Sequence, residues 1–168
     1  MIEVAALVVF PMLMAFSAFS DLLTMTIPNR VSLALVVVFA VLAVSLQMPL
    51  AIVASHASCA LAMLIATFVL FHFRLMGGGD AKLAAATALW LGWENLFDYW
   101  FVASLAGGVL TLAILELRRR ELPTALSNSR FLTRLGDKSV GAPYGIALAV
   151  AGLSVYPQSG VWTRLAGG

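Results

Sequence analysis

Long uncharged runs separated by short polar segments dominate the pattern of this chain. The first run, Val4 to Ser20, is close to the length of about 20 apolar residues that a helix needs to cross the hydrocarbon layer of a membrane. A second run, Val31 to Phe73, is too long for one crossing, and Pro49 divides it at a QMP turn. The pattern therefore predicts three membrane helices in this part of the chain, at Val4–Ser20, Val31–Leu46 and Leu50–His72.

Three more apolar stretches follow the glycines at residues 77 to 79. They run from Ala81 to Phe97, from Tyr99 to Leu115 and from Val140 to Tyr156. The first of them is the shortest, because its uninterrupted apolar part extends only from Leu83 to Trp93. We therefore expect an all-α, polytopic membrane protein with a bundle of about six transmembrane helices. A single membrane domain is expected to cover residues 1–168.

The composition agrees with a membrane protein. Hydrophobic residues make up 62% of the chain and charged residues 11%, whereas soluble domains are about half apolar and a quarter charged. The net charge of +2 is too small, and the basic residues too interspersed with apolar runs, to indicate nucleic-acid binding. The N-terminal Met-Ile-Glu lacks the basic region of a signal peptide, so the first run is expected to remain as a span.

The basic residues predict which side of the membrane each loop faces, because Lys and Arg collect in cytoplasmic loops. They follow the first, third and fifth predicted spans, at Arg30, Arg74, Lys82, Arg118, Arg119, Arg120, Arg130, Arg134 and Lys138. The turn after the second span is QMP, and the turn after the fourth carries Glu94 and Asp98. We therefore expect both termini to face outward, with Arg164 as the one basic residue that contradicts the alternation.

Two of the eight acidic residues lie at the ends of predicted spans on the cytoplasmic side. Asp21 closes the first span within FSDLLTMTIPNR, and Asp80 opens the fourth within MGGGDAKL. Two carboxyl groups that come close together share one proton, so that one activates a water molecule while the other polarises a carbonyl group. This chemistry is that of an aspartic protease, and it requires no metal ion or organic cofactor.

The three glycines before Asp80 are consistent with an active-site loop. Gly77, Gly78 and Gly79 allow backbone conformations that are closed to other residues, and they allow an extended substrate to approach closely. Unwound backbone at membrane depth is tolerated only where it lines protein or water, and hydrolysis requires that water.

Together these motifs resemble those of a known family. GGGDAK is similar to the GxGD signature of aspartyl proteases that act at membranes, and the aspartate followed by IPN resembles prepilin peptidases, which trim type IV pilin-like precursors. GAPYGIALA, at residues 141 to 149, resembles the PYG stretch in the short forms that serve Flp, or tight-adherence, pili. The likeness follows nearly the whole chain in order.

The resemblance implies that Asp21 and Asp80 are the catalytic residues. It implies a multi-pass protein of the bacterial inner membrane that cleaves its precursor at the cytoplasmic face, between a short basic leader and the hydrophobic segment. Pilin-like precursors would be its substrates, with membrane lipid and other pilus assembly components as partners. Supporting roles would fall to the motif residues Gly77, Gly78, Gly79, Lys82, Pro28, Asn29, Pro143, Tyr144 and Gly145.

The chain departs from the long prepilin peptidases in its cysteine content. Those enzymes carry an N-terminal segment with paired CxxC motifs and also methylate the new N-terminus. Cys59 is the only cysteine here, so we expect a peptidase without methyltransferase activity, and a buried thiol at Cys59.

Simpler interpretations of the motif residues remain open. Asp80 could act only as the N-cap of a helix that follows the glycines. Pro28 and Asn29 could only end a loop and start a helix, with Asn29 as its cap. Lys82 could reach the lipid headgroups, or it could stabilise an ionised site from nearby.

Three further polar side chains have more than one interpretation. His56, inside the third span, could relay protons or hydrogen-bond within the bundle. His72 lies near the membrane interface and predicts no particular role. Tyr144 could hydrogen-bond near the active site or pack at a helix irregularity.

Two other classes of function compete with the peptidase. A small proton-coupled carrier or channel would also use intramembrane carboxylates, although a carrier is expected to hold them near the membrane midplane on broken helices. In a non-catalytic assembly subunit, both aspartates would be structural. The peptidase is the interpretation that explains all the motifs together.

Overall fold

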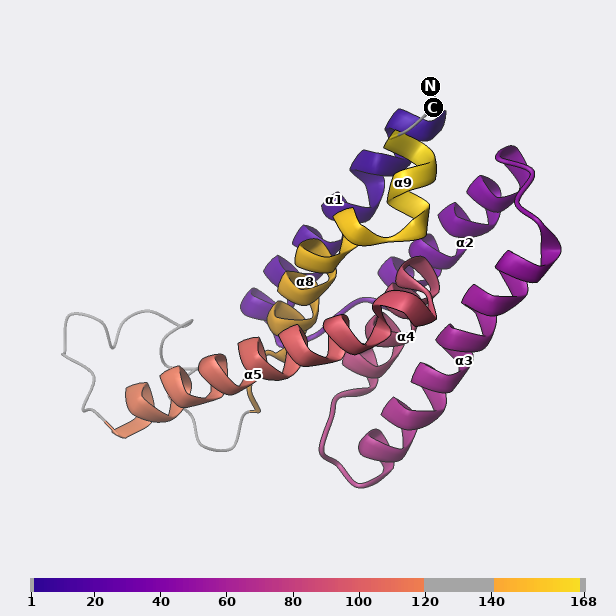
Figure 1. The fold of residues 1–168 in the computed structure, drawn as a ribbon. Helices are drawn as coiled ribbons and strands as arrows, with labels where there is room; N and C mark the ends of the chain where they lie inside the picture. Colours follow the sequence, from indigo (N-terminus) through magenta and orange to yellow (C-terminus); the bar gives the residue numbers. More distant parts are fainter. Residues whose placement is uncertain (1, 120–140, 167–168) are drawn as a thin grey trace.

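The computed structural model describes residues 2–119 and 141–166, and this part of the chain is helical, with no strand (Figure 1). Three stretches are long and apolar enough to cross a membrane, at Leu7–Thr24, Leu50–His72 and Trp93–Arg119, and Asn29–Ser45 is a shorter apolar helix. The prediction of an all-α, multi-pass membrane protein is therefore confirmed. Most of the basic loop predicted after the fifth span, including Arg120, Arg130, Arg134 and Lys138, lies outside the described residues.

The helices follow most of the predicted spans closely. Their bounds are α1 Ile2–Thr24, α2 Asn29–Ser45, α3 Leu50–His72, α4 Gly78–Leu91, α5 Leu96–Arg119, α8 Tyr144–Val155 and α9 Gly160–Ala166, with 3-10 turns η1 Trp93–Asn95 and η2 Tyr156–Gln158. The third span begins and ends as predicted. It begins at Leu50 because Pro49 occupies its N-cap. The short helix α9 was not predicted.

The predicted fourth span, Ala81–Phe97, is wrong at its C-terminal end. α4 ends at Leu91 because Gly92 takes a φ of +70°, a left-handed conformation that suits glycine, and Phe97 belongs to α5. At about 1.5 Å of rise per residue, α4 extends only about 21 Å, which is less than the roughly 30 Å of the hydrocarbon layer.

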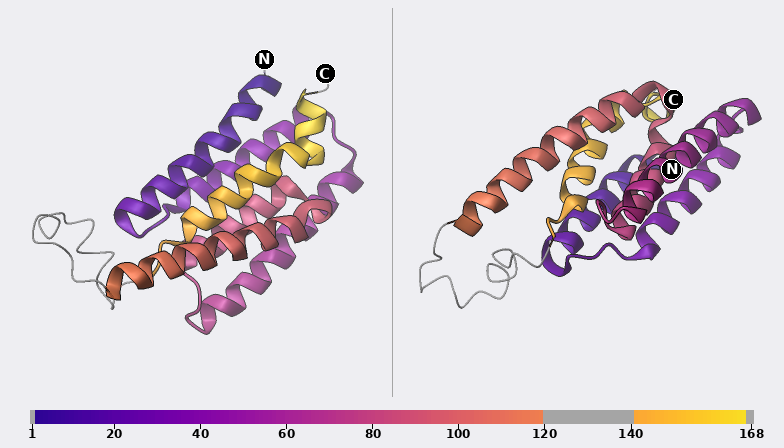
Figure 2. Two further views of the ribbon diagram at one scale, coloured as in Figure 1. Left: turned by 60° about the vertical axis from the view of Figure 1, so that its left-hand side comes forward. Right: turned by 90° about the horizontal axis from the view of Figure 1, so that it is seen from below.

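The short helix α4 lies at the centre of the bundle. Every residue from Leu83 to Leu91 is buried, and α4 packs against α2, α3 and α8. A helix that is apolar on all sides is expected to be surrounded by other helices rather than by solvent. In the right-hand view of Figure 2, α5 lies at one side of the molecule and the α2–α3 pair at the other. α4 is therefore the scaffold on which α2, α3 and α8 pack, whereas α1 and α5 make most of their contacts with α8.

Both termini lie at one end of the bundle, where α9 packs beside α1 (Figure 1). The opposite end holds the α1–α2 loop, the α3–α4 loop and the start of α8, which carry the IPN, GGGD and PYG motifs. The alternation of basic loops predicted this separation of the termini from the motifs.

Trp90 anchors α4 in the core. Its side chain is 0% exposed, and its indole N–H donates a hydrogen bond of 3.0 Å to the carbonyl oxygen of Leu35. The ring also contacts Phe10, Phe39 and Tyr156.

We therefore expect Trp90→Ala to lower the free energy of unfolding by about 3–5 kcal/mol, because it leaves a large cavity and removes the indole hydrogen bond. Equilibrium unfolding in detergent micelles measures this loss. Phe97→Ala, at an aromatic side chain that is 78% exposed, is the control and should change the stability little. Equal losses in both variants would contradict the central role of α4.

Candidate active site

Asp21 and Asp80 line the same cavity, which has a volume of about 390 Å³. Asp21 lies in the last turn of α1 and is only 4% exposed, whereas Asp80 lies in the first turn of α4 and is partly exposed. The other residues that line the cavity belong to the three motif-bearing segments and the end of α3: Met25, Phe71, Arg74, Leu75, Met76, Gly77, Gly141, Ala142 and Tyr144. The fold thus brings together two carboxyl groups that are far apart in the sequence.

The PYG motif holds Asp21 through a backbone hydrogen bond. α8 begins at Tyr144, after Pro143 at the N-cap, and the N–H of Gly145 donates to Oδ2 of Asp21 at 2.7 Å. The first backbone N–H groups of a helix have no partner within the helix. They form the positive end of the helix dipole, which stabilises a carboxylate. A Cβ atom at residue 145 would lie 2.8 Å from this Oδ2 and 2.6 Å from Cδ1 of Ile27. Only glycine fits this position without displacing its neighbours.

Asp80 is not the N-cap of α4, so that simpler interpretation is wrong. Gly77 occupies the N-cap and the helix begins at Gly78, which puts Asp80 three residues after the cap. Its carboxyl group accepts a hydrogen bond from the backbone of Gly77, the reciprocal half of a capping box. Asp80 therefore stabilises the start of α4 and lines the cavity at the same time.

The glycines before Asp80 do not serve the purpose predicted for their backbone. None of Gly77, Gly78 and Gly79 has a positive φ, so the expectation of a conformation closed to other residues is wrong. They are required by close packing instead. A Cβ atom would lie 2.7 Å from Oδ2 of Asp80 at residue 77, and 3.2 Å from the Ile27 carbonyl oxygen at residue 79.

Ile27 connects all three motifs. This buried side chain and its backbone contact Gly79 in the first turn of α4 and Gly145 in α8. The sequence of the IPN motif did not indicate this role, because an isoleucine in an apolar chain has no distinguishing signal.

Asn29 and Lys82 add a polar link between the first two motifs. Nζ of Lys82 donates a hydrogen bond of 2.9 Å to Oδ1 of Asn29, between two exposed side chains. Pro28 is the N-cap of α2 and Asn29 its first residue, so the interpretation of Asn29 as a cap is wrong. Lys82 is not among the residues that line the aspartate cavity. Its ammonium group therefore joins the starts of α2 and α4 rather than pairing with either carboxylate.

Two residues that the sequence did not indicate shape the cavity. Met25 and Arg74 have φ values of 55° and 60°, an uncommon left-handed conformation for side chains of this size. Each follows the end of a helix and turns the chain around the cavity. The sequence indicated Arg74 only as a basic residue that predicts the membrane orientation. A left-handed residue that is neither Gly nor Asn has no sequence signal that would predict its conformation.

The remaining polar side chains have structural contacts. Nδ1 of His56 lies 2.8 Å from the carbonyl oxygen of Leu89, at the opposite end of α4 from Asp80, which confirms hydrogen bonding within the bundle. Tyr144 lines the aspartate cavity, and its hydroxyl lies 3.3 Å from Oγ1 of Thr111. His72 is exposed at the end of α3, and Cys59 is buried as predicted. In the described part of the chain, no three His, Cys, Asp or Glu side chains cluster closely enough to hold a metal ion.

Asp80 lies outside the three stretches that can cross a membrane, and its surroundings alter its acidity. Burial and, to a smaller extent, the negative charge of Asp21 raise the pKa of Asp80 from 3.8 to about 7. The hydrogen bond from Gly77 acts in the opposite direction but is outweighed. Asp80 therefore keeps its proton up to nearly neutral pH beside a second carboxyl group.

The chain is similar in sequence to known proteins over part of its length. A model of the type IV leader peptidase family matches residues 8–112, a range that includes both Asp21 and Asp80. A prepilin leader peptidase/N-methyltransferase of Pectobacterium carotovorum subsp. carotovorum is 34% identical over 73 residues. Those residues are 44% of this chain and 24% of that protein, so the chain covers about a quarter of the length of this curated relative. No solved structure matches the chain.

The contact between Gly145, Ile27 and Asp21 leads to a prediction about stability. Gly145→Ala is expected to lower the free energy of unfolding by about 1–3 kcal/mol, because the new methyl group overlaps with both neighbours. The measurement is thermal unfolding in detergent. Gly160→Ala is the matched control, because a Cβ atom there meets no atom within 4 Å. If both variants unfold like the wild type, the close packing around Asp21 is not tight enough to exclude a side chain.

Proposed function

This chain belongs to the type IV leader peptidase family, and we propose that it is a membrane-embedded aspartic endopeptidase that removes the short leader from type IV pilin-like precursors at the cytoplasmic face of the bacterial inner membrane. One observation carries the proposal: Asp21 and Asp80, from different helices, line one cavity. The proposal concerns the peptidase reaction alone. The family match does not favour the alternative of a proton-coupled carrier, and no observation in the described structure supports that alternative.

Asp80 is the member of the pair that carries the shared proton. Its pKa of about 7, and the contribution that the charge of Asp21 makes to it, support this assignment. Asp21 is the ionised member, and the hydrogen bond from the Gly145 N–H holds its carboxylate and stabilises its charge.

Hydrolysis then proceeds by general acid–base catalysis. Asp21 takes a proton from a water molecule while the water oxygen attacks the carbonyl carbon of the scissile peptide bond. Asp80 donates its proton to the carbonyl oxygen, and a tetrahedral gem-diol forms. The proton on Asp21 then passes to the leaving amine, and a gem-diol hydroxyl returns a proton to Asp80 as the C–N bond breaks. The water oxygen becomes part of the new carboxyl group. Asp21 is then again ionised and Asp80 again protonated.

The positions of the charged residues support the cytoplasmic face. Arg30, Arg74 and Lys82 lie at the end of the bundle that carries the motifs, whereas Glu94 and Asp98 lie at the other end. Basic residues favour the cytoplasmic side of a membrane. A cavity at this end is therefore reached by cytoplasmic water and by a leader segment that stays in the cytoplasm.

Replacing either aspartate by its amide tests the proposed roles. Asp21→Asn and Asp80→Asn are each expected to lower the cleavage rate by at least about a hundredfold to a thousandfold, because the amide neither accepts nor donates the shared proton. A co-expressed type IV prepilin that stays at its higher mass on a gel reports the loss. Asp98→Asn, at an exposed residue at the opposite end, should cleave like the wild type. Full trimming by either active-site variant would rule out the assignment.

The raised pKa of Asp80 predicts the pH dependence of the reaction. Below about pH 7 Asp80 is protonated; as the pH rises through this value the proton is lost, and no acid remains to polarise the carbonyl group. We therefore expect kcat/KM to fall about tenfold for each pH unit above the pKa. Initial rates with a purified enzyme and precursor across neutral pH measure this. A rate that keeps rising in alkaline buffer would show that Asp80 is not the acid.

A further inference from the structure

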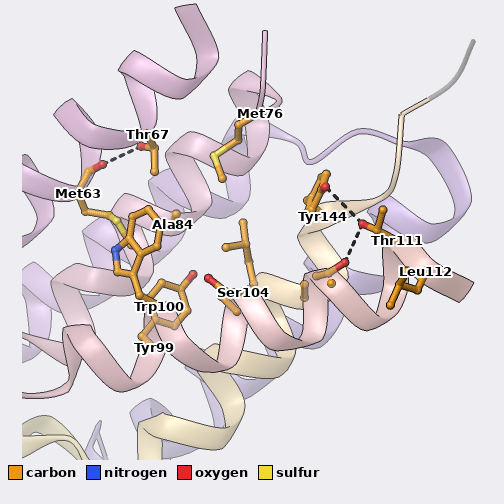
Figure 3. Close-up of a pocket in the computed structure, with 15 residues that line it drawn as sticks. Met63, Thr67, Met76, Ala84, Tyr99, Trp100, Ser104, Thr111, Leu112 and Tyr144 are labelled. Carbon is orange, nitrogen blue, oxygen red and sulfur yellow. Dashed lines mark hydrogen bonds between the residues drawn. The ribbon is translucent and has the colours of Figure 1, made fainter. Parts of the chain in front are cut away.

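A second cavity, of about 480 Å³, adjoins the aspartate cavity. Met76 and Tyr144 line both cavities, so the two spaces meet at these residues. Figure 3 shows Met76, Tyr144 and residues of α5 around this second space. Its walls come from α3, α4, α5 and α8 and are mostly apolar. We call it the α5 groove.

The α5 groove is elongated along one face of α5. Its lining residues on this helix recur at helical spacing from Trp100 through Ser104 and Gly108 to Leu112, a distance of about 18 Å along the helix axis. Small side chains in the middle of this face allow a second helix to approach the backbone closely. A Cβ atom at Gly108 would meet no atom within 4 Å, so the groove is unfilled at this point.

One polar group lies in the wall of this groove. Tyr99 lines the groove and is 0% exposed, and within the described structure its hydroxyl makes no bond that meets hydrogen-bond geometry. Its polar neighbour is Thr87, whose hydroxyl donates to the carbonyl oxygen of Leu83 at 2.9 Å and whose oxygen can also accept from Tyr99. The groove surface itself is therefore mostly apolar beside this buried pair.

We propose that the α5 groove binds the apolar helix of the precursor that follows the scissile bond. This inference rests on the proposed function. The groove has the apolar lining and the length of a helix binding site, and it adjoins the aspartate cavity at Met76 and Tyr144. The precursor helix lies along α5 and unwinds where it reaches these two residues.

Cysteine cross-linking tests the docking without catalysis. The enzyme carries Cys59→Ala to remove its native thiol and Asp80→Asn to prevent cleavage, and the precursor is a type IV prepilin with one cysteine in its apolar segment. Both are reconstituted in vesicles of phosphatidylethanolamine and phosphatidylglycerol. We expect Gly108→Cys to form a disulfide with the precursor about tenfold faster than Ala113→Cys, because Ala113 is exposed and outside the groove. Equal or faster cross-linking at residue 113 overturns the proposal.

Filling the groove tests its effect on the reaction. Gly108→Leu, in the otherwise unchanged enzyme, is expected to raise KM for the same prepilin about tenfold with little change in kcat, because the loss is one of binding. Ala113→Leu should retain both constants. An unchanged KM in Gly108→Leu overturns the proposal and would indicate that lipid fills the groove. If the wild type fails to cleave the prepilin, the proposed function fails instead, and the cross-linking result still decides whether the helix docks.

Discussion

The close contact of Ile27 with Gly79 and Gly145 is the constraint on which the site depends. Ile27 lies between Gly79 at the start of α4 and Gly145 at the start of α8, and a Cβ atom would lie 3.2 Å from Ile27 at residue 79 and 2.6 Å from its Cδ1 at residue 145. Protein interiors are packed densely enough that one added methyl group is felt. The two carboxyl groups can therefore line one cavity only while these three segments remain in contact. Lys82 and Asn29 strengthen the same junction with a polar link on its exposed side.

A carboxyl group at the edge of the lipid layer is costly, and this fold reduces the cost with helix N-termini. The first turn of α8 presents the Gly145 N–H to Asp21, and the start of α4 presents the Gly77 N–H to Asp80. Both arrangements use amides that have no partner within their own helix. Burial still outweighs these bonds at Asp80, which leaves one acidic proton available near neutral pH. The same local structure thus retains both carboxyl groups and keeps one of them protonated up to nearly neutral pH.

The division of work among the helices follows from their lengths. α4 is too short to cross a membrane unaided, yet all its residues from Leu83 to Leu91 are buried, so this part of its surface meets other helices. Asp80 is thereby attached to a largely buried helix. α5, at one side of the molecule, carries small residues towards an open groove that adjoins the aspartate cavity. One bundle thus combines a buried helix that carries Asp80 with an open groove beside α5.

The sequence by itself determined the all-α membrane fold, the bounds of α3, the separation of the termini from the motifs and the pair of candidate aspartates. These features depend on hydropathy, prolines and charge, which are local properties of the chain. The tertiary structure alone decided that Gly92 ends α4, that Gly77 rather than Asp80 caps it, that Ile27 joins three motifs, and that Lys82 binds Asn29. It also decided the α5 groove and the turns at Met25 and Arg74. The contacts of Ile27, the bond between Lys82 and Asn29 and the α5 groove join segments that are far apart along the chain. Helix packing sets the distances between these segments and leaves no periodic signal in the sequence.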